Sequence, residues 1–387
     1  MLQRIDAEAA HALASRGLRI ATAIPGVSSL LRRICGPRDQ RLEVRTLGLN
    51  FPSPLGVAAG VDKDATWYDS LGALGFGFVE VGTVTARSQP GNRRPRVFRL
   101  PRDRAILNRM GFPNPGSEAV ADRLYRRTGQ TIIGVNVGKS KVVPIEDAAK
   151  DYRESVRRLA ELSDYLVINV SSPNTPGLVE MQDVDRLRAL IMETRAELRD
   201  SRVPVLVKIA PDLADTAIDA IAGLAVDMAL DGIIAVNTTV DCGGLTTSAD
   251  AVSDLGYGGI SGAPLKTSAL RVLRRLYEQV GDRLVLISVG GIETPEDAWE
   301  RILAGATLVQ AHTGFVYEGP LWPRRMNREL ARLAREAGVS SIQEAVGRGA
   351  TKSSRDVASP ESFASQLDAA LTNGRNAPAH ARLLHRP

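Results

Sequence analysis

The alternation of strands and helices between residues 55 and 337 constrains the fold more than any other feature of the sequence. Eight short runs rich in Val, Ile and Leu are predicted as strands, at 55–59, 77–83, 131–136, 165–170, 204–209, 232–237, 284–289 and 306–311. A helical pattern follows each run, near 65–74, 116–128, 145–162, 181–199, 213–229, 265–280, 294–303 and 322–337. Parallel strands require crossover connections of this kind. Eight such units over roughly 280 residues predict an α/β fold, a (β/α)8 TIM barrel, because barrels of this type have about 250 residues.

A doubly wound open sheet is the competing architecture for an alternating chain. The number of strands argues against it, and so does the lack of a GxGxxG motif at the start of the first helix. One connection, 87–115, is too long for a simple link and contains the β-prone run 97–100. We predict that this connection contributes an inserted strand over the mouth of the barrel.

The segments outside the barrel form two further regions. Residues 1–45 are predicted as an N-terminal two-helix extension, in which Asp6 caps the first helix and Pro25 ends it. The second helix carries a one-sided apolar stripe formed by Val27, Leu30, Leu31 and Ile34. These helices either pack on the barrel or form an amphipathic basic lid that lies on a membrane and admits an apolar partner. The barrel is assigned to 46–345, and the region 346–387 is predicted to be a disordered tail.

Composition restricts the partners and the cellular setting. The net charge is +5 and the isoelectric point about 9.3, but acidic and basic residues are interleaved and only 4% of residues are aromatic, which argues against nucleic acid as a partner. Cys35 and Cys242 are far apart, so neither a disulfide framework nor a zinc site is predicted. No apolar run approaches the roughly 20 residues of a membrane span. Any contact with a membrane is therefore expected to be peripheral.

All eight predicted strands end in polar residues or glycine. These ends are 59–63, Gly82-Thr83, Asn136, Asn169, Lys208, Asn237-Thr238, Gly290-Gly291 and His312-Thr313-Gly314. The fourth end opens the run 167–177, a loop rich in Asn, Ser, Pro and Gly, and turns alone favour these residue types. Active sites of TIM barrels form where the strands end, however, and eight coincident polar ends favour a binding site there.

The residue types at these ends suggest what they bind. Glycines after the seventh and eighth strands let backbone N–H groups approach an anion such as a phosphate. Lys63 and Lys208 end apolar runs, where an unpaired ammonium is costly, so each is expected to meet an anionic group. Asparagines both donate and accept hydrogen bonds, which suits a flat heterocycle with amide groups. Together they predict a site for a flavin and a planar, amide-bearing acid, and no metal-ligand spacing or Ser-His-Asp order competes with it.

The motifs at these positions resemble the dihydroorotate dehydrogenases of the membrane-associated, quinone-dependent class. The resemblance covers roughly residues 6 to 345 and is carried by AAGVDKD at 58–64, VGTVT at 81–85, QPGN at 89–92, PRVFRL at 95–100, NRMGF at 108–112, GVNVGK at 134–139, NVSSPNT at 169–175, VKIAPDL at 207–213 and SVGGI at 288–292. It implies oxidation of (S)-dihydroorotate to orotate in pyrimidine biosynthesis. FMN would be the first acceptor and a membrane quinone the second, in a peripheral enzyme on the cytoplasmic side of the cell membrane.

The resemblance also implies roles for individual residues. Ser172 would be the catalytic base that removes the C5 proton, with Thr175 and Phe112 framing the proton relay. Substrate contacts are implied for Lys63, Asn108, Arg109, Met110, Gly111, Phe112, Asn169, Asn174, Asn237 and Thr238. FMN contacts are implied for Ala59, Gly60, Val61, Asp62, Lys63, Thr83, Asn136, Asn169, Lys208, Val236, Gly262, Gly291, His312 and Thr313. The quinone site is assigned to His11, Arg99 and His312.

Two residues differ from what is usual in the family. Val236 stands where Thr is usual, and His312 stands where Tyr is usual, so an imidazole expected to titrate near neutrality faces the quinone.

Two other functions remain as alternatives: an FMN oxidoreductase that acts on another dihydropyrimidine, and a non-catalytic relative that keeps the flavin as a structural ligand.

Overall fold

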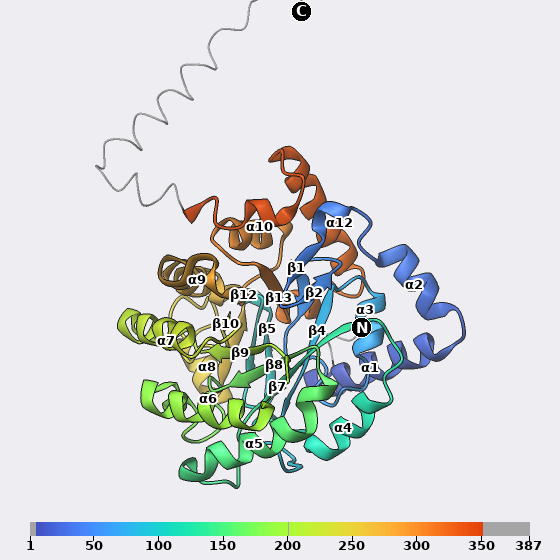
Figure 1. Ribbon diagram of the computed structural model, residues 1–387. Helices are drawn as coiled ribbons and strands as arrows, with labels where there is room; N and C mark the ends of the chain where they lie inside the picture. Colours follow the sequence, from blue (N-terminus) through green and yellow to red (C-terminus); the bar gives the residue numbers. More distant parts are fainter. Residues whose placement is uncertain (1–4, 200, 351–387) are drawn as a thin grey trace, which may run out of the picture.

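Eight parallel strands close into a barrel in the computed structural model, which describes residues 5–199 and 201–350 (Figure 1). Around the barrel the strands follow the order β10, β12, β13, β3, β4, β7, β8 and β9. Their bounds are β3 (Leu55–Val57), β4 (Phe78–Val84), β7 (Ile132–Val137), β8 (Tyr165–Asn169), β9 (Val205–Ile209), β10 (Gly232–Ala235), β12 (Val285–Val289) and β13 (Leu308–Ala311). Each coincides with one strand expected from the sequence, so the predicted (β/α)8 barrel is confirmed.

Helices wrap the outside of the barrel, because each presents an apolar stripe to the strands (Figure 1). In α9 (Lys266–Val280) the buried residues recur with the helical period and are Ala269, Val272, Leu273, Leu276 and Val280. The other helices expected from the sequence are α3 (Tyr68–Ala73), α4 (Ser117–Tyr125), α5 (Ala148–Leu159), α6 (Val184–Leu198), α7 (Asp215–Asp227), α10 (Pro295–Leu303) and α12 (Trp322–Glu336). Two short helices, α8 (Ala249–Leu255) and α11 (Thr313–Glu318), have no counterpart in the predicted pattern.

A short hairpin covers the amino ends of the strands. It consists of β1 (Val44–Thr46) and β2 (Leu49–Phe51), which pair antiparallel and were not predicted. The Phe51 ring packs edge-on against Phe78, the first residue of β4, with 5.3 Å between ring centroids. The hairpin therefore closes the end of the barrel opposite the strand termini that carry the polar residues.

A three-stranded antiparallel sheet lies at the carboxyl ends of the barrel strands. Its order is β11 (Gly259–Gly262), β6 (Ala105–Asn108) and β5 (Val97–Leu100), and it has a small core of its own, to which Leu100 and Ile260 belong. The strand expected at 97–100 is thus confirmed. Its distant partner β11 is a Gly-Ile-Ser-Gly run with few β-formers, which explains why the sequence pattern does not indicate it.

Two helices precede the barrel, as predicted. Asp6 caps α1 (Ala7–Ala23) by accepting a hydrogen bond from the N–H of Ala9 at 2.9 Å, and α2 (Val27–Cys35) follows after a break. Both helices are fastened to the barrel: Thr22 of α1 shares a hydrogen bond of 2.7 Å with Ser70, and Arg32 of α2 donates to Thr131 at 3.0 Å. The two-helix extension is therefore docked on the barrel.

The tail expected at 346–387 falls almost entirely outside the part of the chain that the structure describes, which ends at residue 350. Within the described ranges, none of the helices combines the length and apolar character needed to cross a bilayer.

Candidate active site

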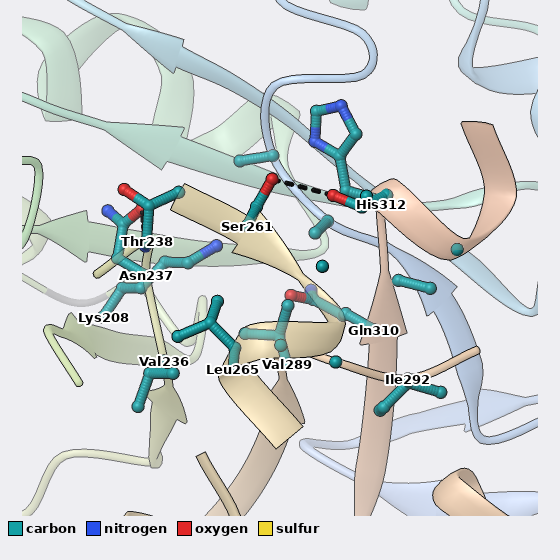
Figure 2. A pocket seen from close by; sticks show the side chains of 18 residues that line it. Lys208, Val236, Asn237, Thr238, Ser261, Leu265, Val289, Ile292, Gln310 and His312 are labelled. Carbon is teal, nitrogen blue, oxygen red and sulfur yellow. Dashed lines mark hydrogen bonds between the residues drawn. The ribbon is translucent and has the colours of Figure 1, made fainter. Parts of the chain in front are cut away.

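A cavity of about 640 Å³ opens at the carboxyl ends of the barrel strands, between the barrel mouth, the three-stranded sheet and α1. A smaller pocket of about 70 Å³ adjoins it at the ends of β12 and β13 (Figure 2). Six residues line both spaces, namely Ala59, Lys208, Asn237, Thr238, Ser261 and His312. The two spaces are therefore continuous, and together they reach from the barrel axis to the N-terminal helices.

The smaller pocket has a backbone suited to an anion. Gly290 and Gly291 adopt φ angles of 109° and 76°, and a Cβ added at Gly291 would lie 2.6 Å from the backbone nitrogen of Lys266. Only glycine fits such a close approach. The hydroxyls of Ser261 and Thr313 lie 2.8 Å apart on the same wall, and a dashed line in Figure 2 marks the hydrogen bond of Ser261. Backbone N–H groups and hydroxyls are the donors that bind phosphate, so the pocket fits the phosphate of a nucleotide.

Lys208, on β9, joins the two spaces and belongs to a buried polar network. Its ammonium lies 3.3 Å from Oε1 of Glu80, a carboxylate with no solvent exposure on β4. Asn136 donates to the same oxygen at 2.7 Å, and Gln310 donates to Oε2 at 2.6 Å. Figure 2 shows Lys208 and Gln310 on opposite walls of the pocket. The ammonium of Lys208 is thus held at the base of the cavity, and the carboxylate of Glu80 partly balances its charge.

Amide side chains cluster around the loop that follows β8. Asn174 donates to the backbone carbonyl of Asn108 at 3.2 Å, and Asn237 donates to Ser171 at 3.0 Å. The Oδ1 atom of Asn174 is buried and has no hydrogen-bond partner among the described residues. An unpaired buried acceptor is costly, so this atom is poised to accept from an N–H group of a ligand.

Ser172 lies on the same loop, at the wall of the larger cavity. It is buried, and its Oγ accepts from the backbone N–H of Asn174 at 3.3 Å. Phe112 also lines the cavity, whereas Thr175 is buried behind the loop. Only Phe112 of the two lines the cavity, and their framing of the proton relay stays a prediction.

Lys63 reaches the cavity from the loop after β3. Its ammonium donates to the carbonyl of Gly60 at 2.5 Å, and removal from water lowers its pKa from the ordinary value. The loop is held by Asp62, whose carboxylate accepts from the N–H groups of Thr66 and Trp67, each at 2.9 Å. A cationic donor at this place suits a carboxylate ligand.

The outer part of the cavity is formed by the N-terminal helix. His11 of α1 packs edge-on against Trp67 at 5.5 Å between ring centroids, and Arg99 of β5 donates to the carbonyl of Ile5 at 2.7 Å. Burial first, and then the charges of Lys63, His11 and Lys208, lower the pKa of His312 to about 3. The expectation that His312 titrates near neutrality is therefore wrong, because its ring is desolvated among cationic groups.

Most residues assigned from the sequence line the two spaces; besides Thr175, three do not. Asp62 turns its carboxylate to its own loop, and Asn136 bonds to Glu80, Thr83 and Asn169 behind the wall. The guanidinium of Arg109 points away from the cavity and donates to the carbonyls of Leu255 and Tyr257. These three residues support the site without facing it.

The structure also adds residues to the site that sequence reasoning missed. They are Ser261, Leu265 and Gln310, which line the smaller pocket, and Glu80, which lies beneath it. A signal was present for two of them, since Glu80 and Gln310 are polar residues in otherwise apolar barrel strands. Ser261 lies on the unpredicted strand β11 and carried no such signal.

The fold and the site together define a (β/α)8 barrel with an anion pocket at one end of its cavity and a Lys-Asn-Ser cluster at the centre. Comparison with known proteins makes the class specific. The family model for dihydroorotate dehydrogenase matches residues 41–333. The chain belongs to the dihydroorotate dehydrogenase family, whose members depend on a flavin.

Individual relatives agree with this placement. The chain is 60% identical to a dihydroorotate dehydrogenase (quinone) of Thermobifida fusca over 90% of its own length and 94% of that protein. It is 54% identical to the enzyme of that name from Rhodococcus opacus, over 90% and 97% of the two chains. Among solved structures, DHODH from Eimeria tenella in complex with ferulenol has a TM-score of 0.79 and 36% identity, with 89% of this chain and 95% of that chain covered. The resemblance seen in the sequence motifs is thereby confirmed.

Proposed function

We propose that the chain oxidises (S)-dihydroorotate to orotate in the synthesis of pyrimidines, with FMN as its cofactor and a membrane quinone as its electron acceptor. The observation that carries this proposal is the continuity of the cavity. An anion pocket, a cluster of amides with Lys63 and Ser172, and a channel walled by α1 open into one another. Such an arrangement lets one cofactor meet a polar substrate on one side and an apolar oxidant on the other.

FMN fits the smaller pocket and the space beside Lys208. Gly262, Gly290, Gly291 and Thr313 would hold its phosphate, while Lys208, Asn169, Thr83 and Asn237 surround the place for its ring. Bound there, FMN would supply the two-electron chemistry that links substrate oxidation to quinone reduction. Val236 lines the pocket without a side-chain hydroxyl, so only its backbone can bond to the cofactor.

Dihydroorotate would lie among the amides, with its carboxylate at Lys63 and its ring N–H and C=O groups at Asn108, Asn174 and Asn237. The unpaired Oδ1 of Asn174 would accept from a ring N–H. Ser172 would take the proton from C5 at its Oγ while the hydrogen on C6 leaves with its electron pair. Because a serine hydroxyl is a weak base, the step depends on a closed, water-poor site and an onward proton acceptor.

The quinone would enter along α1 and reach His11, Arg99 and His312. We assign residues 1–45 to membrane contact and quinone access, 46–345 to the FMN-binding barrel, and the cytoplasmic side of the cell membrane to the enzyme. Leu13, Ile20 and Ile24 support this assignment, since each is more than half exposed on or next to α1. Exposed apolar side chains on a short helix suit the interfacial region of a bilayer.

Substrate choice tests the proposal. The purified enzyme should produce orotate from dihydroorotate with a soluble quinone, and should act poorly on dihydrouracil, which has no carboxylate for Lys63. The variant Lys63→Met should lose most of this preference, because it removes the cation. Equal rates on both substrates, or orotate formation that Lys63→Met leaves unchanged, would contradict the proposed substrate. A bound flavin that no dihydropyrimidine reduces would indicate the non-catalytic alternative.

A further inference from the structure

We propose that Glu80 is a positioning residue that sets the reduction potential of the flavin, by fixing the ammonium of Lys208 and offsetting its charge. Glu80 lines neither of the two spaces, so it would act through its partners. The inference rests on the proposed binding of FMN beside Lys208. It concerns how easily the cofactor takes up electrons, whatever substrate delivers them.

The burial of Glu80 requires an explanation, because it lies in the middle of an apolar strand. Its neighbours in β4, Val79 and Val81, are fully buried, and its own carboxylate has no solvent exposure. Lys208 is almost as deeply buried, with 5% of its side chain exposed. Burying two charges usually costs more than their attraction returns, so such a pair is weak evidence of a purely stabilising role.

The neutral donors around Glu80 hold the carboxylate from two further strands. Asn136 comes from β7 and Gln310 from β13, while Lys208 comes from β9. Three donors on two oxygens fix both the position and the direction of the carboxylate. The ammonium of Lys208 therefore lies 3.3 Å from a carboxylate of fixed orientation. The distance from this ammonium to the cofactor space is fixed as well.

The electrostatic consequence follows from the sign of each charge. The ammonium of Lys208 stabilises the negative charge that the flavin gains on reduction, which raises the reduction potential. Glu80 opposes this effect, and the opposition is strong because little water screens charges inside the barrel. The native potential is thus lower than that which Lys208 alone would give, which favours passing electrons on to the quinone.

The variant Glu80→Gln removes the charge and can keep the network. Within residues 5–199 and 201–350 the Oε1 atom of Gln310 has no hydrogen-bond partner, so rotation of its amide would let it accept from the new amide at position 80. The oxygen of the new side chain can still accept from Lys208 and Asn136. We expect a higher midpoint potential, with the equilibrium ratio of reduced to oxidised flavin increased at least tenfold, or about 30 mV for two electrons. Equilibration with a redox dye measures this without dihydroorotate.

The variant Gln310→Leu probes the same network without altering a charge. It removes a donor from Glu80 and so strengthens the negative potential near Lys208, and we expect a lower midpoint potential. The rise caused by Glu80→Gln should also shrink in a Lys208→Met background, because the effect passes through the ammonium.

A midpoint potential of Glu80→Gln that is unchanged or lower overturns the proposal, and so does a rise of equal size with and without Lys208. Should Glu80→Gln fail to retain FMN, an unchanged or higher potential in Gln310→Leu overturns it. Failure of the proposed function has a different signature: the parent enzyme would bind no flavin, or its flavin would not be reduced by dihydroorotate.

Discussion

Ser172 is buried at the cavity wall, and its Oγ accepts from the N–H of Asn174. Its neighbour Ser171 instead donates to Asn169 at 3.0 Å and accepts from Asn237. Two adjacent serines of the same loop therefore have different surroundings. Ser172 faces the proposed substrate, and Ser171 forms hydrogen bonds with the amides of Asn169 and Asn237.

We expect Ser172→Ala to retain the FMN spectrum and to slow flavin reduction by roughly 10²–10⁴-fold, the usual range for a lost general base. Ser171→Ala is the matched control. It should weaken dihydroorotate binding by about tenfold, the effect of one lost hydrogen bond, with little change in the rate at saturation. Anaerobic stopped-flow measurements separate the two effects. Equal losses of rate in both variants would remove Ser172 from the role of base.

Two histidines that line the cavity give the stability a pH dependence of known sign. The pKa of His312 is lowered to about 3 and that of His11 to about 4, in both cases first by burial. An unfolded chain protonates both near pH 6.5, so it binds more protons than the folded chain below that pH. Their contribution is therefore fully present above about pH 6.5 and is lost as the pH falls toward 4 for His11 and toward 3 for His312.

His312→Gln should make this dependence shallower, because glutamine does not titrate. Each histidine contributes a slope of about 1.4 kcal/mol per pH unit in that window. Denaturant unfolding at pH 7.5 and pH 4.5 measures the difference between the variant and the parent. Identical slopes would contradict the assignment of His312 as a ring that stays neutral in the folded chain.

Two of the side chains assigned from strand ends, Lys208 and Asn237, line the cavity. The side chains of Arg109 and Asp62 bond elsewhere, because a motif gives the position of a residue and not the direction of its side chain. Arg109 lies over the rings of Phe98 and Tyr257, a partner pair brought together only by the folded sheet.

At the scale of elements, α1 is attached to the strand excursion by a partly buried ion pair. Glu8 accepts from Arg96 at 2.7 Å and from Arg94 at 3.0 Å, and the side chain of Arg96 is only 5% exposed. Burial raises the pKa of Glu8, but its hydrogen bonds and charge interactions with the two arginines outweigh this and hold the pKa below its ordinary value. Arg96 also donates to the carbonyl of Asn92 at 2.8 Å, which links the helix to the loops around the substrate site.

Glu8→Gln should loosen α1 at a cost of about 1–3 kcal/mol, because it weakens the pairing of a buried guanidinium. Arg94→Ala is the control, since Arg94 is largely exposed and its pairing contributes little. Hydrogen exchange of the backbone amides of α1 reports the effect. Faster exchange in Arg94→Ala than in Glu8→Gln would contradict the importance of Arg96.

The exposed apolar side chains of the N-terminal extension lead to a prediction about membrane binding. Replacing Leu13 and Ile20 with serine should weaken binding to anionic lipid vesicles by at least tenfold, since it removes apolar area from the proposed membrane face. Met192→Ser, at an exposed apolar position on α6, is the control and should bind like the parent. Vesicle flotation measures both. Equal binding by all three proteins would indicate that α1 only packs on the barrel.

The strand–helix alternation predicted the elements better than it predicted their partners. All eight barrel strands were visible in the sequence because each is buried on both faces and therefore mainly apolar. The pairing of β11 with β6 joins residues about 150 positions apart, and no local pattern records it. The wall that contains Ser261 was invisible for the same reason.

At the scale of the whole molecule, the barrel brings two chemical environments to one cofactor site. The polar wall near Lys63 and Asn108 suits a charged substrate, and the wall formed by α1 suits an apolar quinone. We propose that electrons enter from the first side and leave toward the second. The variants above alter one side at a time, so each half-reaction can be followed separately.

The most direct test is a double-mixing, anaerobic stopped-flow experiment on the full chain, followed by flavin absorbance. One equivalent of dihydroorotate per flavin should bleach the absorbance of the yellow enzyme. A second mixing with a soluble quinone should restore it, with one orotate formed per cycle. The absence of bleaching by dihydroorotate, or a bleached enzyme that quinone fails to reoxidise, would contradict the account.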